Sequence, residues 1–172
     1  YYKRWMKVFP RIEDAARAPL SRILKSWQGL GYYQRGRNIH KAAKLICEKF
    51  KGKLPQEAEL LKTLPGFGPY TTHAVLSIAF GKRVPIVDAN IRRVCMRLLS
   101  IKGQASPDKD ARILKFLEEV LPSSGISDFN QALMELGALV CRPQEPLCLS
   151  CPVKISCRAY KKGWQDIIPA PK

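Results

Sequence analysis

The chain has 172 residues, 46% of them hydrophobic and 26% charged, a composition typical of globular proteins that excludes wholesale disorder. Its 30 basic and 14 acidic residues give a formal net charge of +16, which favours a polyanion partner, and nucleic acid more than a membrane. The alternative is a basic surface that only keeps the protein soluble. The sequence contains no run of about 18 apolar residues that could span a bilayer.

Apolar residues recur at helical spacing in several segments, and glycines and prolines separate these segments. The clearest helical faces lie within residues 39–50, 113–121 and 129–140. No segment alternates as a strand does, and no internal repeat is found, so the sequence predicts an all-α fold. The connection 81–87 is predicted to join two helical lobes, residues 1–84 and 85–172.

The stretch WQGLGYYQRGRNIHKAAK, residues 27–44, combines glycines, tyrosines and basic residues. Gly29 and Gly31 predict a tight bend that presents Tyr32 and Tyr33. Packing of both tyrosines in the core is the alternative. Three basic residues that follow are candidates for phosphate contacts: Arg35, Arg37 and Lys41.

The stretch LPGFG, from Leu64 to Gly68, resembles a helix–hairpin–helix turn. Gly66 and Gly68 tolerate positive φ and let the backbone approach a partner closely. Pro69 suits the first position of the next helix, whose N-terminal N–H groups and dipole favour a phosphate. Such a turn grips a DNA backbone without reading its sequence, although glycine turns also join helices in many other proteins.

The stretch VPIVDANIRRV, residues 84–94, places Asp88 just before an amphipathic basic helix. Aspartate is a favoured N-cap, and Asn90 could serve in the same way. A cap is therefore the simplest interpretation of Asp88, and a catalytic carboxylate is the alternative.

Four cysteines follow at the spacing C-x6-C-x2-C-x5-C, namely Cys141, Cys148, Cys151 and Cys157. Thiolates are soft ligands that hold iron–sulfur clusters or zinc. A structural zinc site and, less favoured, two disulfides are the alternatives to a cluster.

This cysteine spacing resembles the iron–sulfur loop of the endonuclease III and MutY superfamily of DNA glycosylases. The run FNQALMELGALVC, residues 129–141, and the stretch 27–44 are similar to MutY-type sequences, and the resemblance covers nearly the whole chain. It implies a helix–hairpin–helix glycosylase fold in two lobes. It also implies a 4Fe–4S cluster on the four cysteines, in a loop from which Lys154 and Arg158 could contact DNA.

The resemblance also implies roles for single residues. Tyr70 stands where bifunctional members carry a lysine that attacks the sugar and cleaves the strand through a Schiff base. A phenol cannot form that imine, so a monofunctional glycosylase is implied, while a tyrosine packed on its helix is the alternative. Tyr32 would wedge into the duplex opposite the flipped nucleotide and stabilise the gap that this nucleotide leaves.

Asp88 matches the catalytic aspartate of the superfamily. Loss of a base from deoxyribose develops oxocarbenium-like positive charge, which a fixed carboxylate stabilises. In MutY-type enzymes this carboxylate could also capture the sugar covalently before water completes the reaction. Asn90 would orient Asp88 or a nearby phosphate. The motif here is DAN, whereas many MutY-type proteins have DGN, and DAN also occurs in thymine/uracil mismatch relatives.

MutY-type proteins carry two further parts that this sequence does not match. A glutamate in an N-terminal segment, expected before Tyr1, protonates the leaving purine, and general acids of this kind contribute roughly 10²–10⁴-fold. A C-terminal domain recognises 8-oxoguanine. The chain as given is therefore expected to be weakly active or inactive, even if the full protein is an enzyme.

The sequence thus predicts a monofunctional glycosylase of base excision repair that removes adenine mispaired with 8-oxoguanine or guanine. A thymine/uracil mismatch glycosylase is the alternative within the class, and a non-catalytic, cluster-bearing DNA-binding module is the alternative outside it. An electron carrier is disfavoured by the charge and the hairpin. The expected partner of this monomer is double-stranded DNA with a mismatched or damaged base pair, with no membrane, in the bacterial cytoplasm at the nucleoid or in a eukaryotic nucleus.

Overall fold

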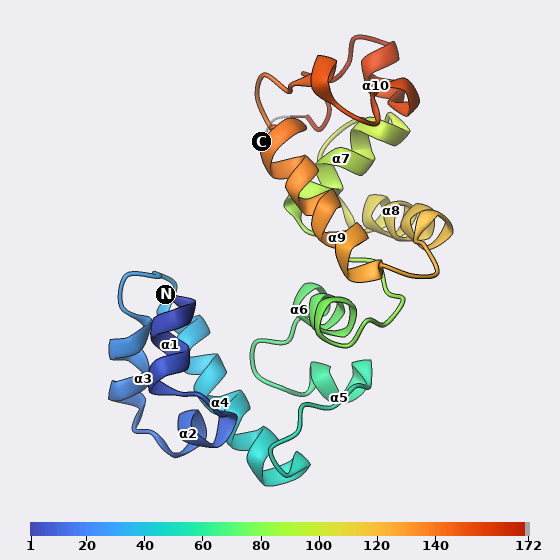
Figure 1. The fold of residues 1–172 in the computed structure, drawn as a ribbon. Coiled ribbons are helices and arrows are strands. Elements are labelled where there is room, and N and C mark those ends of the chain that lie inside the picture. Colours follow the sequence, from blue (N-terminus) through green and yellow to red (C-terminus); the bar gives the residue numbers. More distant parts are fainter. Residues whose placement is uncertain (171–172) are drawn as a thin grey trace. The chain divides into compact units, whose positions relative to one another are not determined.

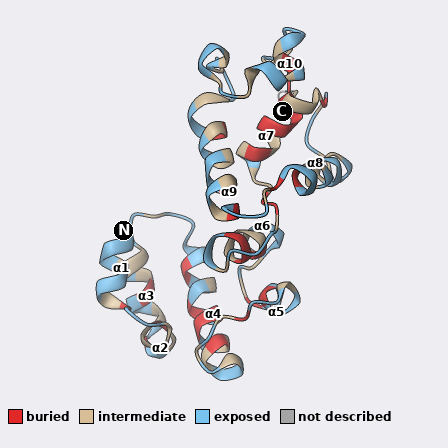
Figure 2. Ribbon diagram, turned by 45° about the vertical axis from the view of Figure 1, so that its right-hand side comes forward, coloured by how far each residue is buried: buried red, intermediate tan, exposed pale blue. Residues whose placement is uncertain are grey.

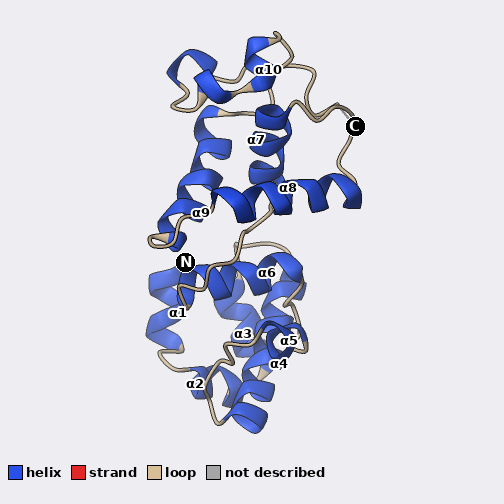
Figure 3. Cartoon of the chain, turned by 90° about the vertical axis from the view of Figure 1, so that its right-hand side faces the viewer, coloured by secondary structure: helices blue, strands red, loops and turns tan. Residues whose placement is uncertain are grey.

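The computed structural model describes residues 1–170, and these residues form helices joined by loops, with no strand among them (Figure 3). The prediction of an all-α fold is confirmed. The chain divides into two compact units, Tyr1–Thr72 and His73–Lys172. The predicted lobes, 1–84 and 85–172, differ from these units in their boundary, and that division stays a prediction.

The first unit is built around one long helix. Its helices are α1 (Tyr2–Val8), α2 (Ile12–Arg17), α3 (Leu20–Trp27), α4 (Tyr33–Phe50), α5 (Ala58–Lys62) and the start of α6 (Pro69–Ala74) (Figure 1). Both α2 and α3 pack against α4. The backbone N–H of Arg11 donates to the Asp14 carboxylate over 3.0 Å, which begins α2 with a capping interaction. Phe9, Ile23 and Ala43 lie in the core of this unit.

The second unit is built around α7 (Ala89–Leu99). Its other helices are α8 (Pro107–Val120), α9 (Ile126–Glu135) and α10 (Arg158–Lys161), with π-helical turns at Val75–Ala79 and Leu136–Val140 and 3-10 turns at Cys148–Ser150 and Lys154–Ser156. Helices α8, α9 and α10 all contact α7, which carries a long run of buried residues (Figure 2). Ile91, Cys95 and Met96 of α7 meet Ile113 and Leu117 of α8 in the core.

The segment 80–88, between the first π-helical turn and α7, is held by hydrogen bonds to residues distant in the sequence. Arg83 donates to the carbonyls of Glu118 and Leu121 at 2.9 and 2.7 Å. The buried Asn130 of α9 donates to the Val84 carbonyl at 3.1 Å and accepts from the backbone N–H of Ile86. The connection that leads to Asp88 is thus an ordered part of the second unit.

Among the described residues, none of the helices has the length and apolar character that crossing a bilayer requires.

Candidate functional site

Asp88 is the N-cap of α7, with an extended backbone at φ −105° and ψ −173°. Its Oδ1 accepts the backbone N–H of Ile91 at 2.7 Å, and the amide of Asn90 lies 3.4 Å from its Oδ2. Asp88 is therefore a helix cap in the structure, as the simplest interpretation of the sequence predicts. The cap uses Oδ1 and leaves Oδ2 with one long hydrogen bond, so the half-buried carboxylate is fixed in direction while one oxygen stays available.

Asn90 is held in turn by Arg93, one turn further along α7. The Arg93 guanidinium donates to Asn90 Oδ1 at 3.0 Å, to the Gly137 carbonyl at 2.5 Å and to the Cys141 carbonyl at 2.7 Å. Burial lowers the pKa of Arg93, and these three acceptors offset the desolvation of its charge. A continuous set of hydrogen bonds therefore runs from the cap of α7 to the first cysteine.

Gly137 makes this arrangement possible because α7 passes directly over it. A Cβ built on Gly137 would stand 2.7 Å from Cβ of Asn90 and 3.0 Å from the Asn90 carbonyl group. Any side chain at residue 137 would push α7 away. The glycine of the run ELGALV is therefore required for packing beside Asn90.

Arg97, the next buried arginine of α7, joins the helix to the cysteine segment. It is 2% exposed and donates to the carbonyls of Ile168, Arg142 and Pro143 at 2.7, 2.7 and 3.1 Å. Its Nη1 also lies 3.3 Å from Sγ of Cys141. A cation is thus built in beside the first of the four thiols.

The four cysteines Cys141, Cys148, Cys151 and Cys157 line one small cavity of about 30 Å³, together with Arg97. All six cysteines of the chain are free, so the disulfide alternative is not observed. Within the part of the chain that the structure describes, no three or more metal-ligating side chains are arranged to hold a metal ion. The donor set nevertheless suits a thiolate-held group, since four sulfurs surround one space beside a buried cation. Lys154 lines the same cavity, and its ammonium group donates to the Leu149 carbonyl at 2.9 Å.

In the hairpin, the two glycines have different roles. Gly66 has φ +89°, and a Cβ there would stand 3.1 Å from Cβ of Asn38 on α4. Gly68 does not have a positive φ, and a Cβ there would meet nothing within 4 Å. Leu64 is buried at the start of the turn, and α6 begins at Pro69 as expected. Gly66 is thus required by the fold, whereas the space at Gly68 is open to a partner.

Tyr70 lies in the first turn of α6 with 46% of its surface exposed. Tyr70 is thus an exposed residue beside the hairpin, and both interpretations of its role stay predictions.

The aromatic loop is a tight bend with Tyr32 at its tip. Gly29 and Gly31 have φ of +90° and +65°, and Tyr32 itself is left-handed at φ 45° and 83% exposed. The Arg35 guanidinium lies 5.4 Å from the centre of the Tyr32 ring and 5.8 Å from that of Trp27. Arg35 thus stacks within the loop. Arg37 is exposed on α4.

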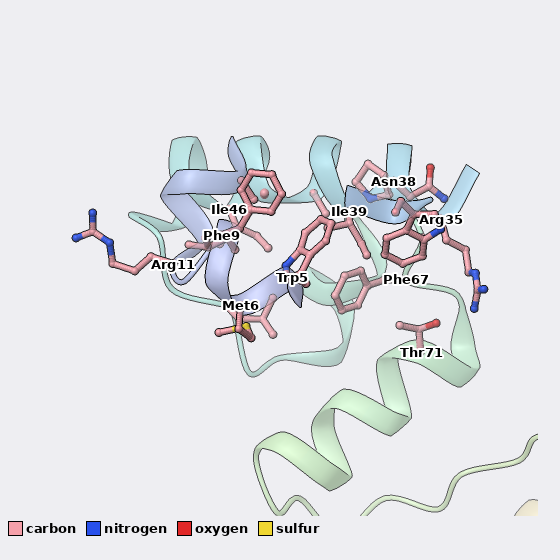
Figure 4. Close-up of a pocket in the computed structure, with 18 of the residues that line it drawn as sticks. Trp5, Met6, Phe9, Arg11, Arg35, Asn38, Ile39, Ile46, Phe67 and Thr71 are labelled. Carbon is pink, nitrogen blue, oxygen red and sulfur yellow. The ribbon is translucent and has the colours of Figure 1, made fainter. Parts of the chain in front are cut away.

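The first unit also contains an apolar cavity of about 570 Å³ between α1, α2, α4 and the hairpin. Trp5, Ile39 and Phe67 gather at its centre, and Thr71 of α6 lies at its edge (Figure 4). No carboxylate or imidazole lines this cavity in the described chain. It therefore has no group that could stabilise a developing cation or move a proton, unlike the surroundings of Asp88.

Residues 1–120 match the family described as "HhH-GPD superfamily base excision DNA repair protein". The chain is 42% identical over 164 residues to an adenine DNA glycosylase of Mus musculus, covering 94% of this chain and 32% of the relative. It is 40% identical over 183 residues to an adenine DNA glycosylase of Buchnera aphidicola subsp. Baizongia pistaciae, covering 100% and 52%. The chain thus spans about a third of the mouse relative and about half of the bacterial one.

Two solved structures are similar to this chain. One is a thermostable thymine-DNA glycosylase, with a TM-score of 0.83 and 28% identity, covering 94% of this chain and 75% of that one. The other is a non-covalent endonuclease III–DNA complex, with a TM-score of 0.80, 29% identity and the same coverage.

Proposed function

The chain belongs to the HhH-GPD superfamily of base excision DNA repair proteins, and from this premise we propose that it forms the catalytic region of a monofunctional DNA glycosylase. The proposed reaction is hydrolysis of the N-glycosidic bond of adenine mispaired with 8-oxoguanine or guanine. Adenine is proposed as the base because the whole chain is about 40% identical to adenine DNA glycosylases.

Asp88 is the proposed catalytic residue. When the adenine leaves, positive charge develops on the deoxyribose, and a carboxylate fixed in advance stabilises that charge without reorganising. The Ile91 N–H and the Asn90 amide hold the Asp88 carboxylate in one direction. The available Oδ2 would face the sugar, either as an electrostatic partner or as a nucleophile. The family resemblance implies that a glutamate in a segment before Tyr1 would supply the proton for the leaving base. The assays therefore use a protein that includes such a segment, called the longer protein below.

Tyr70 is proposed to make the enzyme monofunctional. Its phenol lies at the start of α6, where bifunctional members place the attacking lysine, and it cannot form an imine with the sugar. Release of the base would then be the whole reaction.

The proposed DNA contacts lie on the aromatic loop and the hairpin. Tyr32 has the exposure that a wedge between bases requires. Gly66 would shape the hairpin through its positive φ, and Gly68, where the space is open, would let the backbone come close to a phosphate. Arg37 would contact a phosphate directly. Arg35 would act through Tyr32, because its guanidinium supports the ring.

The four cysteines are proposed to hold a 4Fe–4S cluster. When bound, the cluster would cross-link the segment 141–157, which contains Lys154 and leads directly into Arg158. Iron and sulfide content of the purified chain tests this proposal, and about four of each per chain are expected. A colourless preparation that contains one zinc instead would contradict it.

A thymine/uracil mismatch glycosylase is the second candidate, because DAN stands at residues 88–90 and the thymine-DNA glycosylase structure is similar to this chain. A panel of duplexes with A opposite 8-oxoguanine, A opposite G, T opposite G and U opposite G separates the two in single-turnover assays of the longer protein. Faster release of T or U would favour the second candidate. Binding without release from any duplex would favour a non-catalytic module.

A further inference from the structure

A basic groove lies in the second unit between α8 and α10, and it is here called the α8–α10 groove. Leu99 and Phe116 form its floor, and its volume is about 580 Å³. Three cations and one carboxylate form its rim, namely Arg112, Lys115, Arg158 and Glu119. Arg112 and Lys115 are three residues apart on α8 and therefore share one face of that helix.

The groove is distinct from the surroundings of Asp88. Asp88 caps the N-terminal end of α7, and Leu99 is the last residue of the same helix. The 11 residues of α7 separate the two ends by about 16 Å, at about 1.5 Å per residue. Groups bound in the groove and at Asp88 would thus be different parts of a ligand.

Within residues 1–170, the cations of the groove take part in no salt bridge. Among the described residues, the salt bridges are Arg11–Asp14, Lys62–Glu59 and Arg92–Asp110. None of the rim cations takes part in them, nor does Glu119. By contrast, Arg93 and Arg97 of the same unit are buried and donate to internal acceptors. The positive charge of the groove is thus exposed and available to an anion.

A second observation on α10 and its neighbours also points to an anion. The ammonium groups of Lys102 and Lys162 lie 3.7 and 4.6 Å from the centre of the same Trp164 ring. Two like charges are thereby brought together at one indole, and residues 158–165 contain no carboxylate. Lys162 follows α10, which begins with Arg158, and both residues are exposed, so further positive charge lies four residues along the chain from the groove.

We propose that the α8–α10 groove binds the phosphate backbone of duplex DNA outside the part of the duplex that Asp88 faces. The inference rests on the proposed function only for the identity of the polyanion. The rim cations would each approach a phosphate, while Leu99 and Phe116 would pack against sugars. Such contacts carry no sequence information. They would lengthen the bound segment of DNA and help the protein to stay on the duplex between target sites.

The test is the salt dependence of binding to an undamaged duplex, so its result does not depend on base release. The double variant Arg112→Gln/Lys115→Gln removes two rim charges from one exposed helix face. The matched control, Lys49→Gln/Lys53→Gln, removes two exposed charges near the C-terminal end of α4. The slope of log K against log salt should become shallower by about 1.8 in the groove variant, at about 0.9 per phosphate contact. The control should keep the slope of the unmodified chain.

Two results would overturn the proposal. Equal slopes for the unmodified chain and the groove variant would show that the groove contacts no DNA. Equal losses in the groove variant and the control would show a general effect of net charge. Binding to a polyglutamate peptide is measured in parallel: if only this binding is weakened in the groove variant, the groove fits an acidic protein segment instead of DNA. Thermal melts confirm that both variants are folded.

Discussion

The backbone N–H of Ile91 donates a 2.7 Å hydrogen bond to Oδ1 of Asp88. One carboxylate thus closes the first turn of α7 and is held in a single orientation by doing so. A helix N-terminus also favours negative charge on its cap. The proposed catalytic group and the cap are therefore the same carboxylate, and their effects can be separated by a substitution that keeps the cap.

Asp88→Asn should abolish most base release in the longer protein while the fold persists. Asparagine caps helices about as well as aspartate, so the free energy of unfolding should change by less than about 0.5 kcal/mol. Loss of the negative charge should lower the single-turnover rate by at least about 100-fold. DNA binding should survive. Asp128→Asn, which removes an exposed carboxylate from the first turn of α9, is the control and should leave base release unchanged. An active Asp88→Asn enzyme would contradict the assignment.

Tyr70→Lys should give the chain a new covalent activity. A primary amine in the first turn of α6 can attack the sugar of an abasic site and form an imine, which borohydride reduces to a stable protein–DNA adduct. A duplex with a preformed abasic site is used, so the result is independent of base release. Tyr70→Arg is the control, because it adds a cation that stays protonated and cannot form the imine. Equal trapping with the unmodified chain would place Tyr70 away from the sugar.

Gly66→Ala and Gly68→Ala should have different effects. At Gly66 the φ of +89° and the contact with Asn38 predict a loss of roughly 1–2 kcal/mol in the free energy of unfolding. At Gly68 the open space predicts a change within about 0.5 kcal/mol. Gly68→Ala should instead weaken DNA binding, by about 0.5–1.5 kcal/mol if one backbone–phosphate hydrogen bond is lost. Urea denaturation and equilibrium binding of both variants check this. Unchanged affinity in Gly68→Ala would contradict close approach of DNA at this residue.

Cys95 should make the chain less stable at alkaline pH. Burial, with a smaller contribution from Cys141, raises the pKa of the Cys95 thiol from 9.0 to about 12. Below pH 9 the thiol is neutral in both states, whereas between pH 9 and about 12 only the unfolded chain ionises it. The contribution of Cys95 to stability is therefore present below pH 9 and falls as the pH rises, by about 1.4 kcal/mol per unit at most.

Cys95→Ala removes this titration. Because lysines and tyrosines of the whole chain also titrate at alkaline pH, the quantity to measure is the difference in unfolding free energy between the unmodified chain and Cys95→Ala. Because the variant loses the buried sulfur, its free energy of unfolding should be lower than that of the unmodified chain by an amount that is constant below pH 9. Above that pH the difference should shift in favour of the alanine variant. A difference that does not change with pH would show that the thiol is not protected by burial.

The sequence predicted the parts of the protein whose signals are local. Helical spacing in residues 39–50 and 113–121 corresponds to α4 and α8, and the position of Pro69 corresponds to the start of α6. Glycines at 29 and 31 predicted the bend that exposes Tyr32. Each of these features depends on residues close together in the chain, so a pattern in one stretch is enough to show it.

The contacts that position Asp88 could not be predicted in this way. Besides its local bond to Asn90, Arg93 donates to carbonyls 44 and 48 residues away. The partners of Asn130 in segment 80–88 are 44 and 46 residues away, and Gly137 is required only because α7 crosses it. The sequence does contain one signal of these contacts. Arg93 and Arg97 lie four residues apart on the apolar side of an amphipathic helix, where an arginine must be buried and therefore needs acceptors. For Arg35 the sequence predicts only a phosphate contact, because its stacking on Tyr32 depends on how the loop bends.

The cavity between α1, α2, α4 and the hairpin has a practical consequence for work in solution. Trp5 and Trp27 both line it, and their rings lie edge to face with centres 5.9 Å apart. Indole emission shifts to shorter wavelength when water around the ring is displaced, so these two side chains form an intrinsic fluorescent reporter. With Trp164→Phe removing the indole of the other unit, a titration with any apolar molecule that fills the cavity could be followed without attaching a dye.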